Sequence, residues 1–317
     1  MPLTCIDLFA GTGAFSYALR DHGVECVFAN DVAKASQAVY EANHANGAFV
    51  LGDLHGIETS DIPKHDILCA GFPCQPFSVS GHQRGLEDKR SHAIWKVVDI
   101  LRMHQPEMFV LENVKRLLTH NGGKTLSTIL QRLQTTGYCM KHCVIDTRKV
   151  SGIPQHRERL YIVGFRNQDR CEAFDFATTP PKARRPVCSL LEHSAVPSKY
   201  YYTHKAKVFG LVTEHVEKHI DTNTLYQLRR HYVRENKSGC CPTLMATMGT
   251  GGNNVPLLRD DRGVRKLTPR ECFNLQGFPP EFALPPLCDT HLYKLAGNAV
   301  SLPVVELLVR KMLSDII

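Results

Sequence analysis

Residues 67–80, ILCAGFPCQPFSVS, constrain the fold more than any other stretch of this chain. The apolar run that begins the stretch predicts a buried strand, which Gly71 ends, and Cys74 follows between Pro73 and Pro76. Proline fixes φ and removes a backbone donor, so a loop of this composition is stiff around the thiol. Because open α/β sheets bind their ligands beyond the carboxyl ends of their strands, the stretch predicts such a sheet with a cysteine at its ligand-binding edge.

A cysteine in this position has two interpretations. It is either a nucleophile, which must form a thiolate and therefore needs polar or cationic neighbours, or a buried structural cysteine. We expect the structural role for most of the 12 cysteines in the chain. They lack the paired spacing of zinc ligands and several lie in apolar runs, which indicates free thiols in a reducing compartment.

A second strand-and-turn pattern lies near the N-terminus. A short apolar strand ends in Phe9-Ala10-Gly11-Thr12-Gly13, after which helical spacing resumes. A strand, a glycine turn and a helix form a loop that lets a cofactor approach the backbone. The turn lacks the full GxGxxG pattern, so it favours a nucleoside cofactor over a dinucleotide, although the loop alone leaves a nicotinamide-binding oxidoreductase open.

Acidic residues follow the next two predicted strands. Asp31 comes after a strand predicted at 24–29, where its carboxylate would accept hydrogen bonds from ribose hydroxyls or cap the helix predicted over 33–45. Asp53 comes after a short strand predicted at 48–51, in a Gly-Asp pair that by itself predicts a turn.

Charged residues also mark the ends of later strands. Glu112 follows a strand predicted at 107–111, and a charge at the tip of a buried strand has either a functional role or a helix-capping role. Arg157 and Arg159 precede the apolar strand predicted at 160–165, and residues two apart on extended chain share one face. The alternative for this pair is a solvated turn.

Regular periodicity fades between about 170 and 262, and most of the excess positive charge lies there. Of the net charge of +7, residues 179–262 supply 13 Lys and Arg against 7 Asp and Glu, a difference of +6. Clustered prolines at 180–186 predict a linker, and aromatic residues then alternate with cations from Tyr200 to Arg234. This composition suits contacts with nucleic-acid phosphates, and its alternative is a solvated basic face.

The motif GFPCQPFS resembles the nucleophile motif of the cytosine-5 DNA methyltransferases. Other segments resemble the remaining motifs of that family in the same order: DLFAGTGAF at 7–15, ENV at 112–114, QHRER at 155–159, RKLTPRECFNLQGFP at 265–279 and GNAV at 297–300. The resemblance covers nearly the whole chain except about 180–240. On these motifs the chain is identified as a member of the family, of the bacterial or viral modification type.

The resemblance implies an α/β fold in which a Rossmann-like sheet typical of S-adenosylmethionine-dependent methyltransferases is joined to a smaller target-recognition domain. Both termini are expected to build one lobe. Residues 1–178 and 281–317 would then form a discontinuous catalytic and cofactor-binding domain. Residues 179–280 would form the target-recognition domain with its hinge.

The implied activity is methyl transfer from S-adenosylmethionine to carbon 5 of a cytosine flipped out of a specific double-stranded DNA sequence. S-adenosylhomocysteine is the product, and no metal is implied. Cys74 would form a covalent adduct at carbon 6, while Glu112 and Arg159 hold the edge of the pyrimidine and Arg157 lies near Cys74 and the base. We expect these four residues to be catalytic.

The resemblance also implies binding residues. Those for the cofactor are Phe9, Ala10, Gly11, Thr12, Gly13, Asp31, Val32, Asp53, Leu54, Pro73, Asn298 and Val300, with Val32 standing where the family often carries an aromatic residue. Those for DNA are Ser78, Ser80, Gln83, Arg84, Arg230, Arg234, Thr243, Gly251, Gly252 and Asn253. The polar segment 80–91 is expected to close over DNA as a mobile loop.

The expected partner is double-stranded DNA, and a cognate restriction endonuclease would belong to the same system. We expect a monomer in the cytoplasm and no membrane association, because no apolar run reaches about 20 residues. A tRNA cytosine-5 methyltransferase is an alternative, but its typical Cys-Phe-Thr signature is replaced here by Cys272-Phe273-Asn274. A catalytically inactive DNA-binding homologue is a second alternative, against which the intact Cys74, Glu112 and Arg159 argue.

Overall fold

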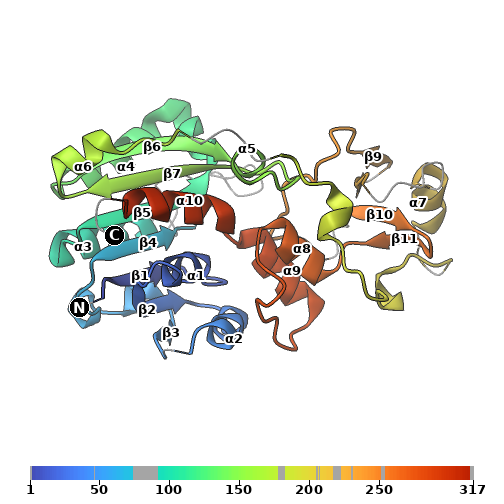
Figure 1. Ribbon diagram of the computed structural model, residues 1–317, viewed down its shortest axis with the longest axis horizontal. Coiled ribbons are helices and arrows are strands. Elements are labelled where there is room, and N and C mark those ends of the chain that lie inside the picture. The colour runs from blue at the N-terminus through green and yellow to red at the C-terminus, as the bar shows by residue number, and fades with distance from the viewer. Residues whose placement is uncertain are drawn as a thin grey trace. The chain divides into compact units, whose positions relative to one another are not determined.

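The computed structural model describes residues 2–45, 47–73, 92–177, 183–204, 206, 208–216, 223–229, 231–250 and 254–314. The chain divides into two compact units, whose elements are labelled in Figure 1. Unit 1 contains Met1–Asp146, Glu158–Thr179 and Leu302–Ile317, whereas unit 2 contains Thr147–Arg157 and Pro180–Ser301.

These boundaries differ from the predicted ones at residues 147–157 and 281–301, which lie in unit 2. The reason is tertiary bonding that local patterns do not reveal. The side chain of Gln155 donates to the carbonyl of Leu275, and that of Arg157 donates to the carbonyls of Gly297 and Ala299.

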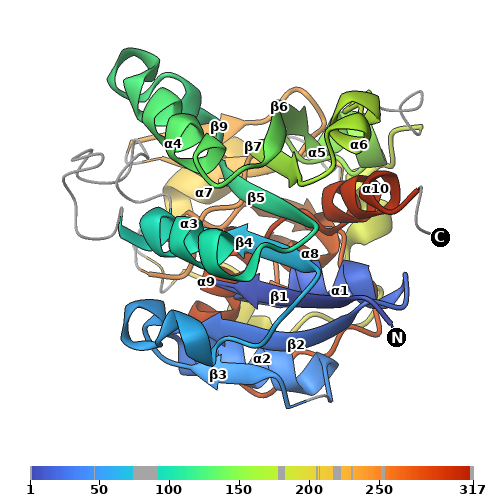
Figure 2. The same ribbon diagram turned by 90° about the vertical axis from the view of Figure 1, so that its left-hand side faces the viewer.

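Unit 1 is built on a seven-stranded sheet with the strand order β3-β2-β1-β4-β5-β7-β6, seen in Figure 2. Strands β1 to β5 pair with one another in parallel, and β7 runs antiparallel to both β5 and β6. The predicted Rossmann-like α/β sheet is therefore confirmed. The strands are β1 (Thr4–Leu8), β2 (Glu25–Asp31), β3 (Phe49–Leu51), β4 (Ile67–Gly71), β5 (Met108–Val114), β6 (Cys139–Asp146) and β7 (Glu158–Phe165).

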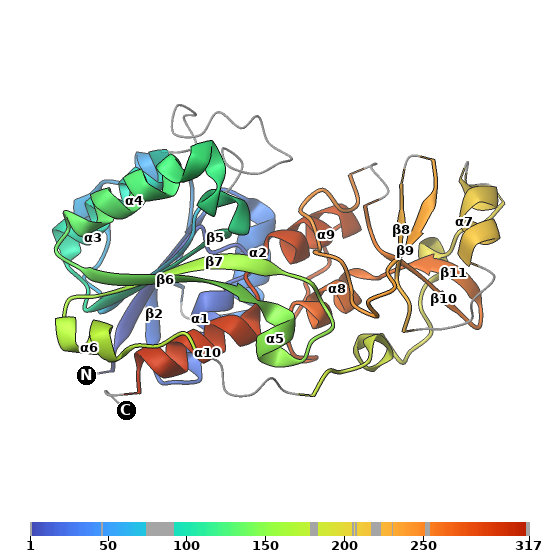
Figure 3. The same ribbon diagram turned by 90° about the horizontal axis from the view of Figure 1, so that it is seen from above.

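Helices cover both faces of this sheet. Figure 3 shows α3 and α4 on one face and α1 and α10 on the other. In α4, Leu126, Ile129 and Leu133 recur at helical spacing and are buried in the core with β5 and β7 residues. The helices of unit 1 are α1 (Ala14–Arg20), α2 (Lys34–Asn43), α3 (His92–His104), α4 (Lys124–Gln134), α6 (Gln168–Ala173), α10 (Leu302–Met312) and the short 3₁₀ helices η1 (Leu54–Gly56), η2 (Thr59–Asp61), η5 (Lys115–Leu118) and η6 (His120–Gly123).

Unit 2 contains a four-stranded sheet with the order β11-β10-β8-β9, antiparallel throughout. Its core buries Val212 and Val216 of α7 against Tyr226, Leu257 and Val264 of the sheet. The strands are β8 (Tyr226–Leu228), β9 (Val233–Glu235), β10 (Leu257–Asp260) and β11 (Gly263–Lys266). The helices are α5 (Thr147–Ser151), α7 (Phe209–Val216), α8 (Pro269–Leu275), α9 (Asp289–Asn298) and the 3₁₀ helices η7 (Val187–Leu190) and η8 (Ser198–Tyr200).

The segment Asp289–Met312, which includes α9 and α10, is long and apolar enough by composition to cross a bilayer. However, 78% of its most apolar window is buried inside the protein. Because burial of this kind is the property of core helices, we interpret α9 and α10 as core helices rather than a membrane span.

The expectation of free thiols is wrong for one pair. Cys139 on β6 and Cys171 on α6 form a disulfide, with their Cα atoms 5.9 Å apart. The packing of α6 against β6 brings the two cysteines within the separation that such a bond requires. The other cysteines of the described residues have free thiols.

Candidate active site

The candidate active site lies along the carboxyl edge of the unit 1 sheet. β1 and β4 are parallel neighbours at the point where the strand order reverses, and open α/β sheets bind ligands beyond such a point. The glycine loop follows β1, and the turn that leads to Cys74 follows β4. Gly71, the last residue of β4, pairs with Glu112 on β5, so three of the predicted site segments share this edge.

The glycine loop, residues 9–13, is held by hydrogen bonds from its amides to the end of β2. The amide of Ala10 donates to the carbonyl of Asn30 at 2.9 Å, and the amide of Gly11 donates to the Asp31 carboxylate at 3.0 Å. Phe9 has a φ of 56°, which is uncommon for a residue with a side chain. Backbone of this kind clusters at ligand sites, so Phe9 supports the predicted role of the loop.

Gly13 packs tightly on α2. An ideal Cβ at this position would lie 2.7 Å from Cδ2 of Tyr40 and 2.8 Å from Nε2 of His44, and the φ of 74° favours glycine as well. Tyr40 and His44 stack with ring centroids 4.3 Å apart, and burial lowers the pKa of His44 to about 4, which keeps it neutral. The stacked rings of Tyr40 and His44 therefore pack directly against the loop at Gly13.

The ends of β2 and β3 bring two carboxylates to this edge. Asn30 donates to the carbonyls of Val50 and Gly52, which ties the two strand ends together. The Asp31 carboxylate also accepts from the amide of Ala33 at 2.9 Å, whereas Asp53 accepts from the amide of His55 and caps η1. Ala33 rather than Asp31 is the N-cap of α2, so the capping alternative for Asp31 does not hold.

These residues fit the nucleoside part of a cofactor. The Thr12 hydroxyl is buried and, among the described residues, has no hydrogen-bond partner, as expected of a group that awaits a ligand. Val32, beside Asp31, is 68% exposed and offers apolar surface to a ring. Leu54, which we expected to bind the cofactor, is buried in the unit 1 core, and its contact with a ligand stays a prediction.

Sequence reasoning missed Asp7, a buried carboxyl within β1. Its Oδ2 accepts hydrogen bonds from the amide and the hydroxyl of Ser16, at 3.2 and 2.9 Å, and the hydroxyl of Tyr40 donates to Ser16 Oγ at 3.3 Å. Burial raises the pKa of Asp7 well above its usual value. The network joins β1, α1 and α2 around the glycine loop, and an acidic residue inside an apolar strand was the available signal.

Glu112 and Arg159 form an ion pair at the same edge. Because β7 is antiparallel to β5, its first residues lie beside the last residues of β5, and Arg159 pairs with Val114 in the ladder. Arg159 Nε lies 3.1 Å from a carboxylate oxygen of Glu112. Their side chains remain 14% and 11% exposed, so the pair is largely desolvated yet accessible from the edge.

Asn113 orients the turn that leads to the predicted nucleophile. Its Nδ2 donates to the carbonyl of Phe72 at 3.1 Å, and its Oδ1 accepts from the amide of Val114. The side chain is buried, so it holds Phe72 and the adjacent Pro73 against β5. This asparagine belongs to the ENV motif at 112–114, but the sequence alone predicted no role for it.

Arg157 lies in a different unit from Arg159. It precedes β7 and lies in unit 2, where its guanidinium donates to the carbonyls of Leu244, Gly297 and Ala299. The side chain is 1% exposed. These contacts favour a structural role for Arg157, and the expectation that it shares a face with Arg159 and lies near Cys74 stays a prediction.

Cys74 itself lies outside the described residues, as do Ser78, Ser80, Gln83, Arg84, Arg230, Gly251, Gly252 and Asn253. Of the other predicted DNA contacts, Arg234 is exposed on β9, and the Thr243 hydroxyl donates to the carbonyl of His156 at 2.5 Å. Asn298 ends α9 and Val300 is buried, both in unit 2. Their predicted functional roles stay predictions.

The motifs and the sheet edge agree with comparisons against known proteins. The sequence profile of the C-5 cytosine-specific DNA methylases matches residues 3–314. The chain belongs to this family. It is 41% identical over 307 residues to the type II methyltransferase M.Bsp6I of Bacillus sp. (strain RFL6), with 96% of each chain covered. It is 36% identical to M.HpaII of Haemophilus parainfluenzae, covering 99% of this chain and 90% of that protein.

Solved structures share the fold of this methylase. A methyltransferase of Entamoeba histolytica, EhMeth, matches with a TM-score of 0.77 at 17% identity, and the Dnmt2 methyltransferase of S. pombe matches with 0.73 at 19%. Each comparison covers at least 99% of both chains. As a member of its family, the protein is a DNA cytosine-5 methyltransferase, and the family uses S-adenosylmethionine as the methyl donor.

Proposed function

We propose that this methylase modifies a cytosine flipped out of a specific double-stranded DNA sequence, through a covalent adduct between Cys74 and carbon 6. The thiolate of Cys74 adds to carbon 6, which makes carbon 5 nucleophilic. After methylation, loss of the carbon 5 proton restores the double bond and releases the thiolate. Flipping the base out of the stack costs a few kcal/mol, to be recovered from contacts in the site.

The single observation that carries the proposal is the Glu112–Arg159 pair at the carboxyl edge of the sheet. Attack at carbon 6 pushes electrons toward ring nitrogen 3, where a carboxyl group on Glu112 would supply a proton or hydrogen bond. Arg159, 3.1 Å from Glu112, would donate to the cytosine carbonyl oxygen. Glu112 pairs with Gly71 three residues before Cys74, which supports placing the base between them.

For the cofactor, we propose that the glycine loop and the ends of β2 and β3 hold S-adenosylmethionine, which supplies a methyl group on a sulfonium. Asp31 would accept from the ribose hydroxyls, Asp53 from the adenine amino group, and Val32 would pack on the ring. The unpaired hydroxyl of Thr12 and the exposure of Val32 support this assignment. We assign Phe9, Ala10, Gly11, Gly13, Leu54, Pro73, Asn298 and Val300 to the same site on the family pattern.

We propose that unit 2 recognises DNA and that the enzyme works as a monomer in a restriction–modification system with a cognate endonuclease. The names of the type II relatives and the excess of positive charge between 179 and 262 support this proposal. Arg230, Arg234, Thr243, Gly251, Gly252 and Asn253 would contact DNA from unit 2, and Ser78, Ser80, Gln83 and Arg84 from the loop that follows Cys74. Arg157 remains a candidate catalytic residue, beside Cys74, Glu112 and Arg159, only because of its position in the QHRER motif at 155–159.

The test is methyl transfer from labelled S-adenosylmethionine to duplex DNA, followed by bisulfite sequencing to identify the target site. Cys74→Ser should abolish incorporation. With wild type, DNA carrying 5-fluorocytosine should form a complex that resists denaturation, because fluorine at carbon 5 cannot leave as a proton does and the adduct is trapped. Cys74→Ser should not form this complex, because it lacks the thiol. Cys288→Ser is the matched control, since Cys288 is an exposed free thiol.

Wild-type incorporation by Cys74→Ser would exclude this cysteine as the nucleophile. Transfer to tRNA in place of duplex DNA would exclude the proposed substrate.

A further inference from the structure

Unit 2 contains a cavity of about 480 Å³ between its sheet, the 200–208 segment and the segment before residue 251. Among the described residues, its lining is cationic and aromatic and includes no acidic side chain. The lining residues are Lys199, Tyr200, Tyr201, Tyr202, Thr203, Ala206, Val208, Gly249, Val255 and Lys266.

Lys199, one of the two cations in this lining, already has a partner. Its ammonium lies 2.9 Å from the Asp289 carboxylate, which also accepts from the hydroxyl of Tyr200. The hydrogen bond to Asp289 raises the pKa of Lys199, as expected of a committed ion pair. Lys199 therefore adds little net attraction for an anion.

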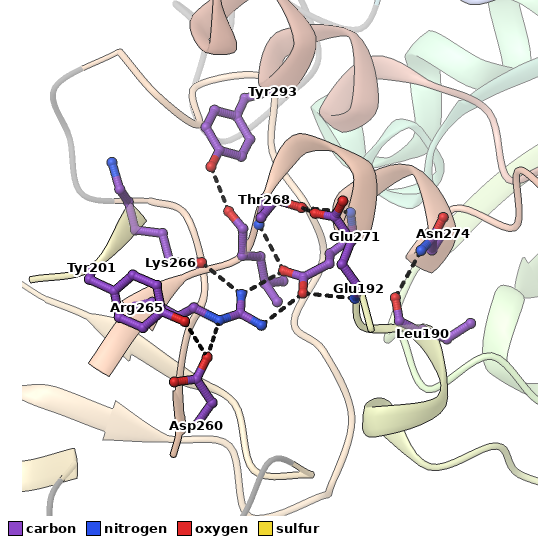
Figure 4. A network of polar contacts seen from close by, with 11 residues as sticks. Leu190, Glu192, Tyr201, Asp260, Arg265, Lys266, Thr268, Glu271, Asn274 and Tyr293 are labelled. Carbon is purple, nitrogen blue, oxygen red and sulfur yellow. Dashed lines mark hydrogen bonds and ion pairs between the residues drawn. The ribbon is translucent and has the colours of Figure 1, made fainter. Parts of the chain in front are cut away.

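Lys266 is the uncommitted cation. In β11 the neighbouring Arg265 lies in a buried ion-pair network with Asp260 and Glu271, and side chains alternate between the faces of a strand. Figure 4 shows the ammonium of Lys266 directed away from that network. Among the described residues, this ammonium makes no hydrogen bond or ion pair, although it lines the cavity.

The cavity adjoins the segment that precedes residues 251–253, to which we assign DNA contacts. Gly249, in its wall, accepts a hydrogen bond from the Thr290 hydroxyl, and an ideal Cβ there would lie 2.9 Å from Cδ2 of Tyr293. The segment is therefore held against α9 just before residues 251–253. The side-chain amide of Asn254 donates to the hydroxyl of Thr247 at 3.1 Å.

We infer that this cavity binds a backbone phosphate of the DNA substrate, with Lys266 as the charged donor and the hydroxyls of Tyr202 and Thr203 beside it. The inference rests on the proposed function. A cation that is unpaired among the described residues, with hydroxyls but no carboxylate in the described lining, suits a phosphate. Contacts of this class fix the position of a protein on DNA without reading sequence. The cavity would thus fix the position on DNA of the adjacent residues to which we assign DNA contacts.

The test is DNA binding by Lys266→Met, measured on target and non-target duplexes from 50 to 200 mM salt. A lost phosphate contact should weaken both affinities by the same factor and lower the slope of log K against log salt by about 0.9. The affinity ratio of wild type to variant should therefore shrink about three- to fourfold across this range. The rate at saturating DNA should not change.

Lys64→Met is the matched control. It removes the same charge from an exposed position before the amino end of β4, opposite the edge that carries the site. Ala206→Phe should fill the cavity without removing a charge, and it should weaken binding to the target and non-target duplexes by the same factor. The thermal midpoint of this variant shows whether it is folded.

Three results would each overturn the inference. Lys266→Met could show the same salt slope as wild type, or Lys64→Met could lower the slope as much as Lys266→Met does. Lys266→Met could also lose affinity for target DNA alone. If wild-type protein does not methylate duplex DNA, the proposed function fails instead. If it does so while Lys266→Met binds like wild type, only the phosphate site fails.

Discussion

Each unit contains a buried glutamate paired with an arginine, and the two pairs differ in how far solvent reaches them. In unit 2, Glu271 accepts two bonds from Arg265 at 2.8 Å and further bonds from the amides of Thr268 and Glu192, and it is fully buried. In unit 1, Arg159 Nε lies 3.1 Å from a carboxylate oxygen of Glu112, and both side chains remain partly exposed.

The difference separates a structural pair from a candidate catalytic pair of the same residue types. A carboxylate enclosed by four donors has no accessible atom for a substrate, and its network joins β11 to the start of α8. A pair at the open end of β5 is desolvated enough for strong hydrogen bonds and still accessible.

Glu112→Gln should lower the rate of methyl transfer by about 10²–10⁴-fold, because the amide keeps the shape of the side chain but cannot transfer a proton. Steady-state incorporation of labelled methyl groups measures the change, and the thermal midpoint should stay close to that of wild type. Nearly full activity would mean that Glu112 resembles Glu271 and supports structure alone.

Glu271→Ala should destabilise the protein by about 3–5 kcal/mol, because it leaves the Arg265 guanidinium buried without its main partner. Denaturant unfolding gives the free energy, with Glu281→Ala, an exposed glutamate in the same unit, as the control. A loss under 1 kcal/mol would show that solvent or Asp260 replaces the pair.

Gly13→Ala should weaken binding of S-adenosylhomocysteine by about tenfold to a hundredfold, since strained backbone and a close contact cost roughly 1–3 kcal/mol. Calorimetric titration measures the affinity. Gly23→Ala is the control because Gly23 has a similar φ of 71° but nothing within 4 Å of an added Cβ. Equal losses of affinity in both variants would argue against the close contact with Tyr40 and His44 as the cause.

Acid should destabilise the protein through histidines that unit 1 buries in the neutral form. Burial lowers the pKa of His65 to about 4, so its contribution to stability is present above the unfolded pKa of about 6.5 and is lost as the pH falls toward 4. Between pH 6.5 and 5.5, wild type should lose about 1 kcal/mol more unfolding free energy than His65→Phe.

Taking this difference between the two proteins cancels the opposing contribution of Asp7, whose pKa is raised by burial. Parallel stability curves for wild type and His65→Phe would contradict the assignment.

Local sequence patterns determined the elements and the edge on which the site lies. The apolar run before Gly71, the glycine turn after β1 and the residues 112–114 at the end of β5 each predicted a strand end from neighbouring residues. Parallel strands present these ends on one edge, so the sequence could place Glu112 and the glycine loop near each other without coordinates.

Only the tertiary structure decided how side chains bond across long stretches of chain. Arg157 reaches the carbonyl of Gly297, 140 residues away, and so belongs to unit 2 although it stands two residues from Arg159. Leu54 is buried in the core, and Cys139 bonds to Cys171 across 32 residues. The physical reason is that periodicity records how a residue relates to its neighbours in the chain, whereas burial and hydrogen-bond partners depend on which distant segments the fold brings together.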